Sequence, residues 1–128
     1  MDESILVSVK LALGITKDYE FFDPQLIMYI NAALATLVQN GVGEPGFTIS
    51  NDLSKWSDFL GEKTTALEYV KVYVISKVRL MFDPPQSSGA QAALKELAAE
   101  YEWRGYIECD ELKIDDESGD SGEEEADD

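Results

Sequence analysis

Acidic side chains near the C-terminus come closest to the spacing of a known chemical site. If Asp116 were the first ligand of a calcium loop, Ser118 and Asp120 would occupy its third and fifth positions. Gly122 would then fall at position seven, whereas the calcium loop requires glycine at position six. The pattern of flanking helices is also missing. We therefore expect no specific metal site here, and only loose association of cations with a polyanionic segment.

Few residues are available for other catalytic or cofactor chemistry. The chain has no histidine and a single cysteine, Cys109. It therefore lacks the commonest general base, the usual nucleophile pairs and the common zinc ligands. We interpret Cys109 as an inert thiol at a helix end. Gly41, Gly43 and Gly46 match a phosphate-binding pattern loosely, but they follow a helical segment and not a strand. The sequence predicts a protein that is not an enzyme and holds no cofactor.

Most of the charge is concentrated at one end of the chain. The 128 residues contain 26 acidic and 10 basic side chains, a formal net charge of −16. Residues 108–128 hold 12 acids and one lysine, a net of −11, which leaves 14 acids and 9 bases, a net of −5, for residues 1–107. Because the acidic segment has almost nothing apolar to bury, it should be disordered. The sequence thus predicts a helical domain at 1–107 and an acidic disordered tail at 108–128.

The composition also limits the partners and the compartment. Lysine and arginine are scattered singly, whereas phosphate recognition needs them clustered, so direct nucleic-acid binding is not expected. No apolar run approaches the ~18 residues of a membrane-spanning helix. The acidic start, Met1 to Ser4, does not resemble a signal peptide, and one cysteine allows no internal disulfide. We expect a soluble intracellular protein without a membrane partner.

Four amphipathic helices are expected, because apolar residues recur every three or four positions. Asp23 should cap the second helix, and Thr65 and Ser88 should each open a capping box for the third and fourth. The third helix is apolar on nearly all sides, which predicts burial in its own domain or against a neighbouring subunit. Pro84 and Pro85 must separate it from the fourth. The four segments are residues 5–13, 23–40, 65–82 and 88–103.

A long glycine-rich loop spans residues 41–53 and is followed by a short helical turn around Trp56. Loops of this length are usually functional or disordered. Phe47 and Ile49 are costly to leave in water, so we expect assembly to order the loop. The predicted fold is all-α, a small bundle of four main helices plus a short helical turn, with this loop and the disordered acidic tail.

One segment is more specific than the general helical pattern. Residues 77–86 read KVRLMFDPPQ, and the helix after them ends EYEWR. This combination resembles the head–tail connector, or adaptor, family of tailed bacteriophages. The likeness covers roughly residues 3–106, and the FDPP break at 82–85 is its most specific part. Further agreement comes from Asn31-Ala32-Ala33 leading to Gly41-Val42-Gly43, and from Trp56-Ser57-Asp58-Phe59.

The resemblance implies an all-α virion protein that assembles into a ring, commonly of about twelve copies, beneath the portal protein. Such a ring extends the DNA channel, through which genomic DNA passes without specific binding, and offers a docking surface for stopper or tail-completion proteins. The chain would be made in the host bacterial cytoplasm and end at the head–tail junction. Aromatic residues are enriched at interfaces. The expected subunit or portal contacts are Phe47, Ile49, Trp56, Tyr69, Tyr73, Pro84, Pro85, Trp103 and Arg104.

A second hypothesis is a free acidic regulator or DNA mimic that occupies a basic site on another protein. A mimic needs acidic charges spaced over a rigid surface. In this chain the acids are concentrated in the tail, which favours the connector hypothesis.

Overall fold

The computed structural model describes the backbone of residues 3–126 and the side chains of residues 3–109. Over residues 3–126 the regular elements are all helical. The predicted all-α class is therefore confirmed, with its four main helices and a short helix at Trp56. The elements are α1 (Ile5–Ala12), α2 (Asp23–Gln39), α3 (Trp56–Leu60), the 3-10 turn η1 (Thr64–Ala66), α4 (Leu67–Phe82) and α5 (Ser88–Ala126).

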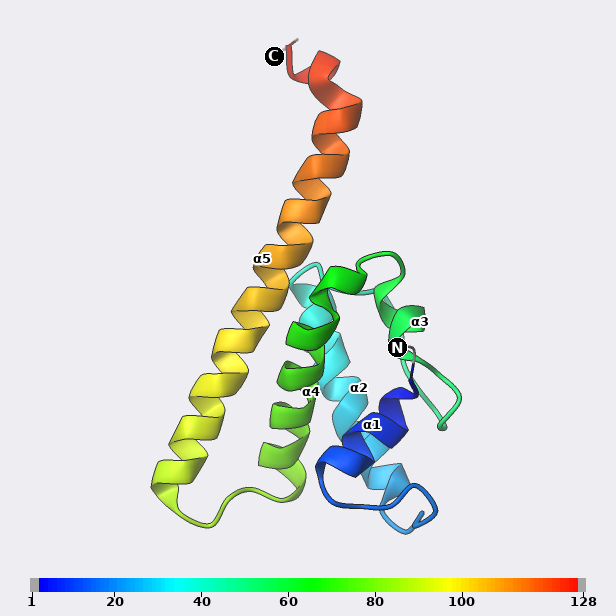
Figure 1. The fold of residues 1–128 in the computed structure, drawn as a ribbon, viewed down its shortest axis with the longest axis vertical. Helices are drawn as coiled ribbons and strands as arrows, with labels where there is room; N and C mark the ends of the chain where they lie inside the picture. The colour runs from blue at the N-terminus through cyan, green and yellow to red at the C-terminus, as the bar shows by residue number, and fades with distance from the viewer. Residues whose placement is uncertain (1–2, 127–128) are drawn as a thin grey trace.

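Helix α4 lies at the centre of the fold. Helix α5 packs along one side of α4, and α2 and α1 pack against it elsewhere (Figure 1). Val70, Tyr73, Val74 and Val78 of α4 are each at most 1% exposed. A helix with partners on several sides needs apolar residues around most of its circumference. The sequence left two outcomes open for this helix, burial in its own domain or against a neighbouring subunit. The structure shows burial in its own domain.

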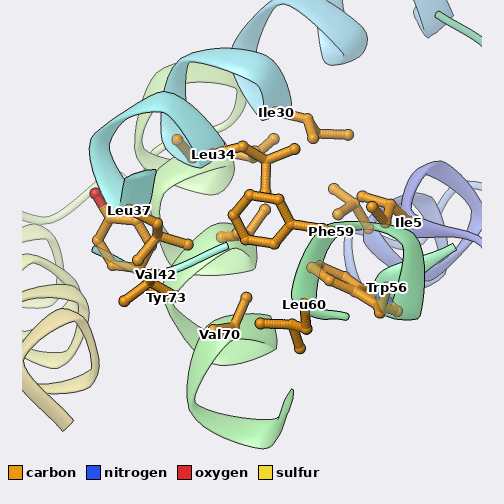
Figure 2. Close-up of a cluster of buried hydrophobic side chains, with 14 of the residues drawn as sticks. Ile5, Ile30, Leu34, Leu37, Val42, Trp56, Phe59, Leu60, Val70 and Tyr73 are labelled. Atoms are coloured by element: carbon orange, nitrogen blue, oxygen red, sulfur yellow. The ribbon is translucent and has the colours of Figure 1, made fainter. Parts of the chain in front are cut away.

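The hydrophobic core is centred between α2, α3 and α4 (Figure 2). Phe59 of α3 is fully buried, and its ring lies against the backbone of Gly43. A Cβ atom built on Gly43 would lie 2.1 Å from the Cζ atom of Phe59. Gly43 also has a φ of 88°, which favours glycine. The glycine in the loop is thus required by both the backbone turn and the packing of Phe59.

The loop between α2 and α3 is attached to its own domain. The Asn31 side chain accepts a hydrogen bond from the Ile49 backbone N–H at 2.8 Å and donates one to the Ile49 carbonyl at 3.0 Å. Ile49 is 3% exposed, and the ring of Phe47 lies 5.3 Å from that of Phe59. Ile49 is therefore covered within its own domain and Phe47 is half-buried there, while the ordering of the loop by assembly remains a prediction. The Asn31 side chain therefore takes the place of a neighbouring strand, because it bonds both the N–H and the carbonyl of Ile49.

Two helix starts differ from the prediction. Asp23 is the first residue of α2 and makes no capping hydrogen bond, because Phe22 occupies the cap position. Helix α4 begins at Leu67 after the 3-10 turn η1, so the capping box expected at Thr65 does not form. Ala66 in the cap position has no side chain that can accept a hydrogen bond. A 3-10 turn can provide the first bonds of a helix in place of a side-chain cap.

Helix α5 begins at Ser88, as predicted, but the residue that caps it lies one position earlier than predicted. The Ser87 hydroxyl, and not that of Ser88, accepts a hydrogen bond from the backbone N–H of Ala90 at 3.0 Å. The Gln91 side chain donates to the carbonyl of Pro85 at 2.8 Å. Pro85 thereby takes part in the helix start that follows the proline break.

Helix α5 continues to Ala126, past the boundary that the sequence suggests at residue 107. Cys109 is 2% exposed and belongs to the core, so the packed domain reaches at least two residues beyond the expected boundary. The disorder of the acidic segment remains a prediction.

Candidate interaction surfaces

The structure divides the nine expected interface residues between core and surface. Ile49, Trp56 and Tyr73 are 3%, 1% and 1% exposed, so they build the core and present no free surface. Apolar and aromatic residues are common both in cores and at interfaces, so residue type alone does not separate the two places. The others reach the surface, with Phe47, Tyr69 and Pro85 half-buried and Pro84, Trp103 and Arg104 exposed. Their role as contacts remains a prediction.

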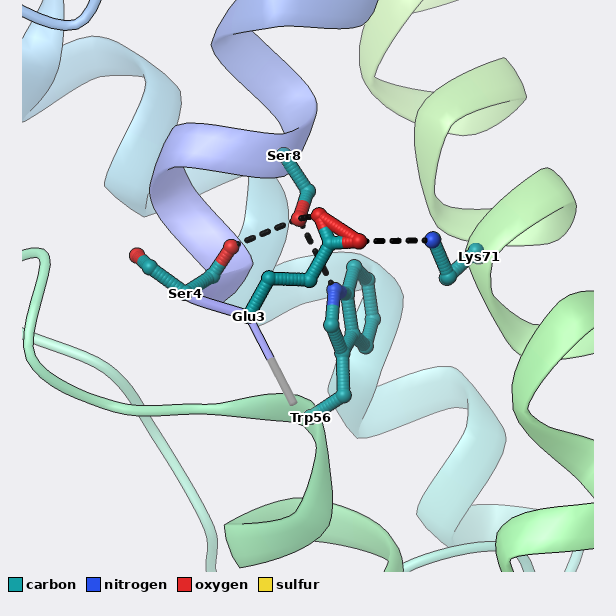
Figure 3. A network of polar contacts seen from close by, with 5 residues as sticks. All are labelled: Glu3, Ser4, Ser8, Trp56 and Lys71. Atoms are coloured by element: carbon teal, nitrogen blue, oxygen red, sulfur yellow. Dashed lines mark hydrogen bonds and ion pairs between the residues drawn. The ribbon is translucent and has the colours of Figure 1, made fainter. Parts of the chain in front are cut away.

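Trp56 belongs to a polar network that the sequence did not reveal (Figure 3). Its indole N–H donates to the Ser8 hydroxyl at 3.1 Å. The Ser8 oxygen lies 2.7 Å from both a carboxylate oxygen of Glu3 and the carbonyl of Ser4. The second carboxylate oxygen of Glu3 accepts from Lys71 at 3.1 Å. The network therefore joins the start of α1 to α3 and α4.

The same network holds the Glu3 carboxylate in its charged form. The hydrogen bond from Ser8, and then that from Lys71, lower the pKa of Glu3 below its ordinary value of 4.5. The backbone at the start of α1 is also hydrogen-bonded to the segment before α3, since the Ile5 N–H donates to the carbonyl of Ser54 at 3.0 Å. Glu3 and Lys71 are 68 positions apart in the sequence, so no local pattern could have predicted their contact. This is a structural site, and it fixes α1 on the domain.

A buried ion pair holds the other end of α1. Lys10 is 1% exposed, and its ammonium nitrogen lies 2.8 Å from Oδ1 of Asp23. The same nitrogen donates to the carbonyl of Lys17 at 3.0 Å. That Oδ1 atom has no well-aligned hydrogen bond, so the contact with Lys10 is chiefly one of charge. Asp23 thus neutralises a buried lysine in place of capping α2.

The exposed aromatic residues of α5 form the first candidate interaction surface. Trp103 is 60% exposed and Tyr106 is 40% exposed. Together with Asn40, Ala99 and Glu102 they line a hollow of about 270 Å³ beside the end of α2. Asn40 donates to the Glu102 carboxylate at 2.7 Å, which fixes one wall of this hollow. We call these five residues the Trp103 surface.

Arg104 lies next to this surface and is held in position. Its guanidinium pairs with Glu100 at 2.8 Å and lies 5.7 Å from the ring centre of Tyr101. The ring of Tyr101 in turn lies 6.1 Å from that of Tyr69 on α4. Tyr69 and Arg104, both expected at an interface, are therefore brought together at the α4 and α5 contact. Glu100 pairs within its own helix, so Arg104 is only partly available to a partner.

A second candidate surface lies where α4 ends and α5 begins. It is a groove of about 400 Å³ whose lining is mostly apolar, and we call it the Arg79 groove. The Arg79 guanidinium has no ion pair among the side chains of residues 3–109. The groove is lined by Arg79, Pro85, Ala90, Ala93, Leu94 and Leu97.

The loop between α2 and α3 presents a third feature. Leu53 is 75% exposed, and its backbone N–H donates to the Asn51 side chain at 2.8 Å. Asp52, between them, also lines an acidic groove of about 400 Å³ with Glu20 and Asp23. We call residues 51–53 the Leu53 tip. This loop lies at the edge of the molecule opposite α5 (Figure 1).

None of these surfaces has the chemistry of an active site. Among the described residues there is no group of three or more side chains placed to hold a metal ion. Burial raises the pKa of Cys109, which keeps its thiol protonated and weakly nucleophilic. The surfaces are instead made of exposed apolar side chains with single charges, which suits contact with other proteins.

Comparison with known proteins identifies a family. The family model described as "Phage connector protein" matches residues 5–111, which include α1 to α4, the first part of α5 and the three surfaces. The comparisons with curated proteins and with solved structures found no match. In the described part of the chain, no helix has both the length and the apolar character needed to cross a membrane. The match covers most of the chain, which therefore belongs to the phage connector protein family.

Proposed function

We propose that this connector is an adaptor subunit that forms a ring of about twelve copies under the phage portal protein. The ring extends the DNA channel and provides the docking surface for a stopper or tail-completion protein. Family membership supports a role at the head–tail junction of the virion. The ring and its docking partners are the proposal.

The observation that supports a ring is the placement of exposed apolar side chains on two opposite edges. Leu97 on α5 is 38% exposed, and Leu53 in the loop between α2 and α3 is 75% exposed. Figure 1 places that loop and α5 at opposite edges. Two different surfaces on opposite edges suit head-to-tail contacts, which close into a ring when the rotation between neighbours permits it.

The Trp103 surface is proposed as the contact with the portal protein. It combines an exposed tryptophan and tyrosine with the fixed polar pair Asn40 and Glu102. Aromatic anchors surrounded by polar groups are typical of the centre of a protein interface. The net charge of −16 supports passage of DNA, because acidic walls repel phosphate and let DNA slide.

Mixing the full chain with the portal protein of the same phage tests this function. We expect native mass spectrometry to show about twelve connector copies on each portal ring. Trp103→Ala should weaken portal binding by on the order of tenfold or more, because truncated anchors commonly cost over 1.4 kcal/mol. Leu11→Ala is the matched control, since Leu11 is also 60% exposed but lies on α1.

Two results would contradict the proposal. One is the absence of any complex with the portal protein at equimolar, micromolar concentrations. The other is a stable complex with a basic partner protein in its place, which would support the acidic regulator.

A further inference from the structure

We propose that the Leu53 tip of one subunit inserts into the Arg79 groove of the next, with Leu53 on the apolar wall and Asp52 beside Arg79. This inference rests on the proposed ring, and it assigns the contact that joins neighbouring subunits. The occupant of the groove is thus a second copy of this chain.

The first argument is that groove and tip match in chemistry. The groove offers Leu94, Leu97 and two alanines around one arginine that has no ion pair with side chains of residues 3–109. The tip offers one leucine, 75% exposed, directly after an exposed aspartate that likewise has no ion pair in the described residues. An aspartate brought beside an arginine at the rim of an apolar contact fixes the register of the two surfaces.

The second argument is that the tip is held in one conformation before it binds. Asn51 accepts the hydrogen bond from the Leu53 N–H, and Ser54 accepts one from Ile5. On the other side, Ile49 is fixed by both hydrogen bonds to Asn31. A short segment anchored on both sides loses little conformational entropy on binding.

The third argument is placement. The tip belongs to the loop on one edge, and the groove lies between α4 and the first turns of α5, the helix at the opposite edge (Figure 1). A subunit cannot fill its own groove, whereas a neighbour in a head-to-tail ring can. Phe21 is equally exposed at 75%, but its ring packs against Phe22 at 5.1 Å. Leu53 is therefore the better candidate for insertion.

Charge reversal tests the pairing on assembled rings. Asp52→Arg and Arg79→Asp should each weaken the apparent affinity between neighbouring subunits by on the order of tenfold. At a fixed concentration, fewer connector copies should then be found on each portal ring. The double variant should restore occupancy toward that of the unchanged chain. Glu62→Arg and Lys17→Asp make the same charge changes at exposed positions outside both surfaces and should have no effect. Circular dichroism checks that all variants fold.

Cysteine cross-linking tests the contact without the portal protein. Leu53→Cys with Leu97→Cys should give, on mild oxidation of the concentrated chain, a ladder of dimers, trimers and longer species. A symmetric two-fold contact would stop at dimers, and it would contradict the inference. Each single variant, which retains the buried Cys109, should give no ladder. Bridging requires Cα atoms within about 7 Å, so a ladder demands close approach.

The two tests distinguish failure of the contact from failure of the ring under the portal. Rings on the portal without cross-links, and without rescue by charge reversal, would overturn this contact and leave the proposed function standing. A ladder in concentrated solution, with no binding to the portal, would support the contact and contradict the proposed function. Absence of both would overturn both.

Discussion

The ammonium group of Lys10 is paired with the carboxylate of Asp23 at 2.8 Å, although Lys10 is almost fully buried. The pair joins α1 to the first turn of α2 across the connecting loop. A buried ion pair contributes little net stability by itself, but removing one partner leaves an uncompensated charge. The pair therefore makes the two helices depend on each other.

The first prediction follows from this dependence. Asp23→Ala should lower the free energy of unfolding by about 3 kcal/mol, because it leaves the Lys10 charge buried and unpaired. Lys10→Met should cost less, since it removes the charge that requires a partner. Urea unfolding measures both changes. Glu20→Ala, at an exposed carboxylate nearby, is the control and should change stability by less than about 0.5 kcal/mol. Equal losses for Asp23→Ala and Glu20→Ala would show that the pair is unimportant.

The second prediction concerns pH. The pKa of Glu3 is lowered in the folded protein, so its contribution to stability is present above 4.5 and is lost as the pH falls below 4.5, through the folded-state pKa. Glu3→Gln should therefore be less stable than the unchanged chain at pH 7. The difference should shrink as the pH is lowered below 4.5. Thermal melting of both chains, repeated at intervals of about 1 pH unit from pH 3 to 7, measures this difference in stability. A difference that is constant with pH would contradict the assigned network.

The third prediction separates two effects of glycine. Gly43→Ala should destabilise the domain by about 3 kcal/mol or more, because the added Cβ would overlap the Phe59 ring at 2.1 Å. Gly46 also has a positive φ, 77°, but nothing lies within 4 Å of its Cβ position. Gly46→Ala should therefore cost only about 1 kcal/mol, from the backbone alone. Chemical denaturation compares the two variants, and equal costs would mean that Phe59 can move aside.

The fourth prediction concerns self-association. Each chain has a net charge of −16, so copies should repel one another and remain monomeric at low salt. Raising the salt from about 0.1 to 1 M shortens the screening length from about 10 to 3 Å and should promote association. Analytical ultracentrifugation measures this. An oligomer that is stable at low salt and dissociates as salt rises would contradict it, and would show that ionic contacts dominate the interface.

The fifth prediction locates the end of the packed domain. A chain that ends at Cys109 should melt at nearly the same temperature as the full chain. A chain that ends at residue 107 lacks the buried Cys109, so its free energy of unfolding should fall by about 1 kcal/mol. That loss corresponds to a Tm lower by about 4–8 °C. Calorimetry on the two truncations measures the difference. If the chain ending at Cys109 fails to fold, the acidic segment is part of the structure and is not a tail.

Local sequence signals predicted most of the fold. Helix α1 ends near Gly14 and α2 near Gly41, where each glycine adopts a positive φ, and the two prolines separate α4 from α5. Such signals act within a few residues, so a sequence shows them directly. Cap positions were less predictable, because Ser87 and Ser88 are adjacent and either hydroxyl could cap a helix that begins here.

The site was harder to predict, because its residues meet across long separations. Ser8 and Trp56 are 48 positions apart, and no local pattern indicates that the indole points inward. Trp103, by contrast, was expected at the surface and is 60% exposed. Leu53 was not identified, since one leucine in a polar loop has no periodic pattern. Its high exposure on a fixed turn is visible only in the folded chain.

Helix α1 is far in the sequence from the residues of α3 and α4 that hold it, and this has a consequence for synthesis in the cell. Helices α4 and α5 are consecutive, so they can pair as soon as both are made. Helix α1 leaves the ribosome first, but Trp56 and Lys71, which fix it, follow 48 and 68 residues after their partners. At 5–20 residues per second the wait for Lys71 is roughly 3 to 14 seconds. During that interval the apolar face of Ile5, Leu6 and Val9 has no partner from α3 or α4, and every copy of the chain passes through this state.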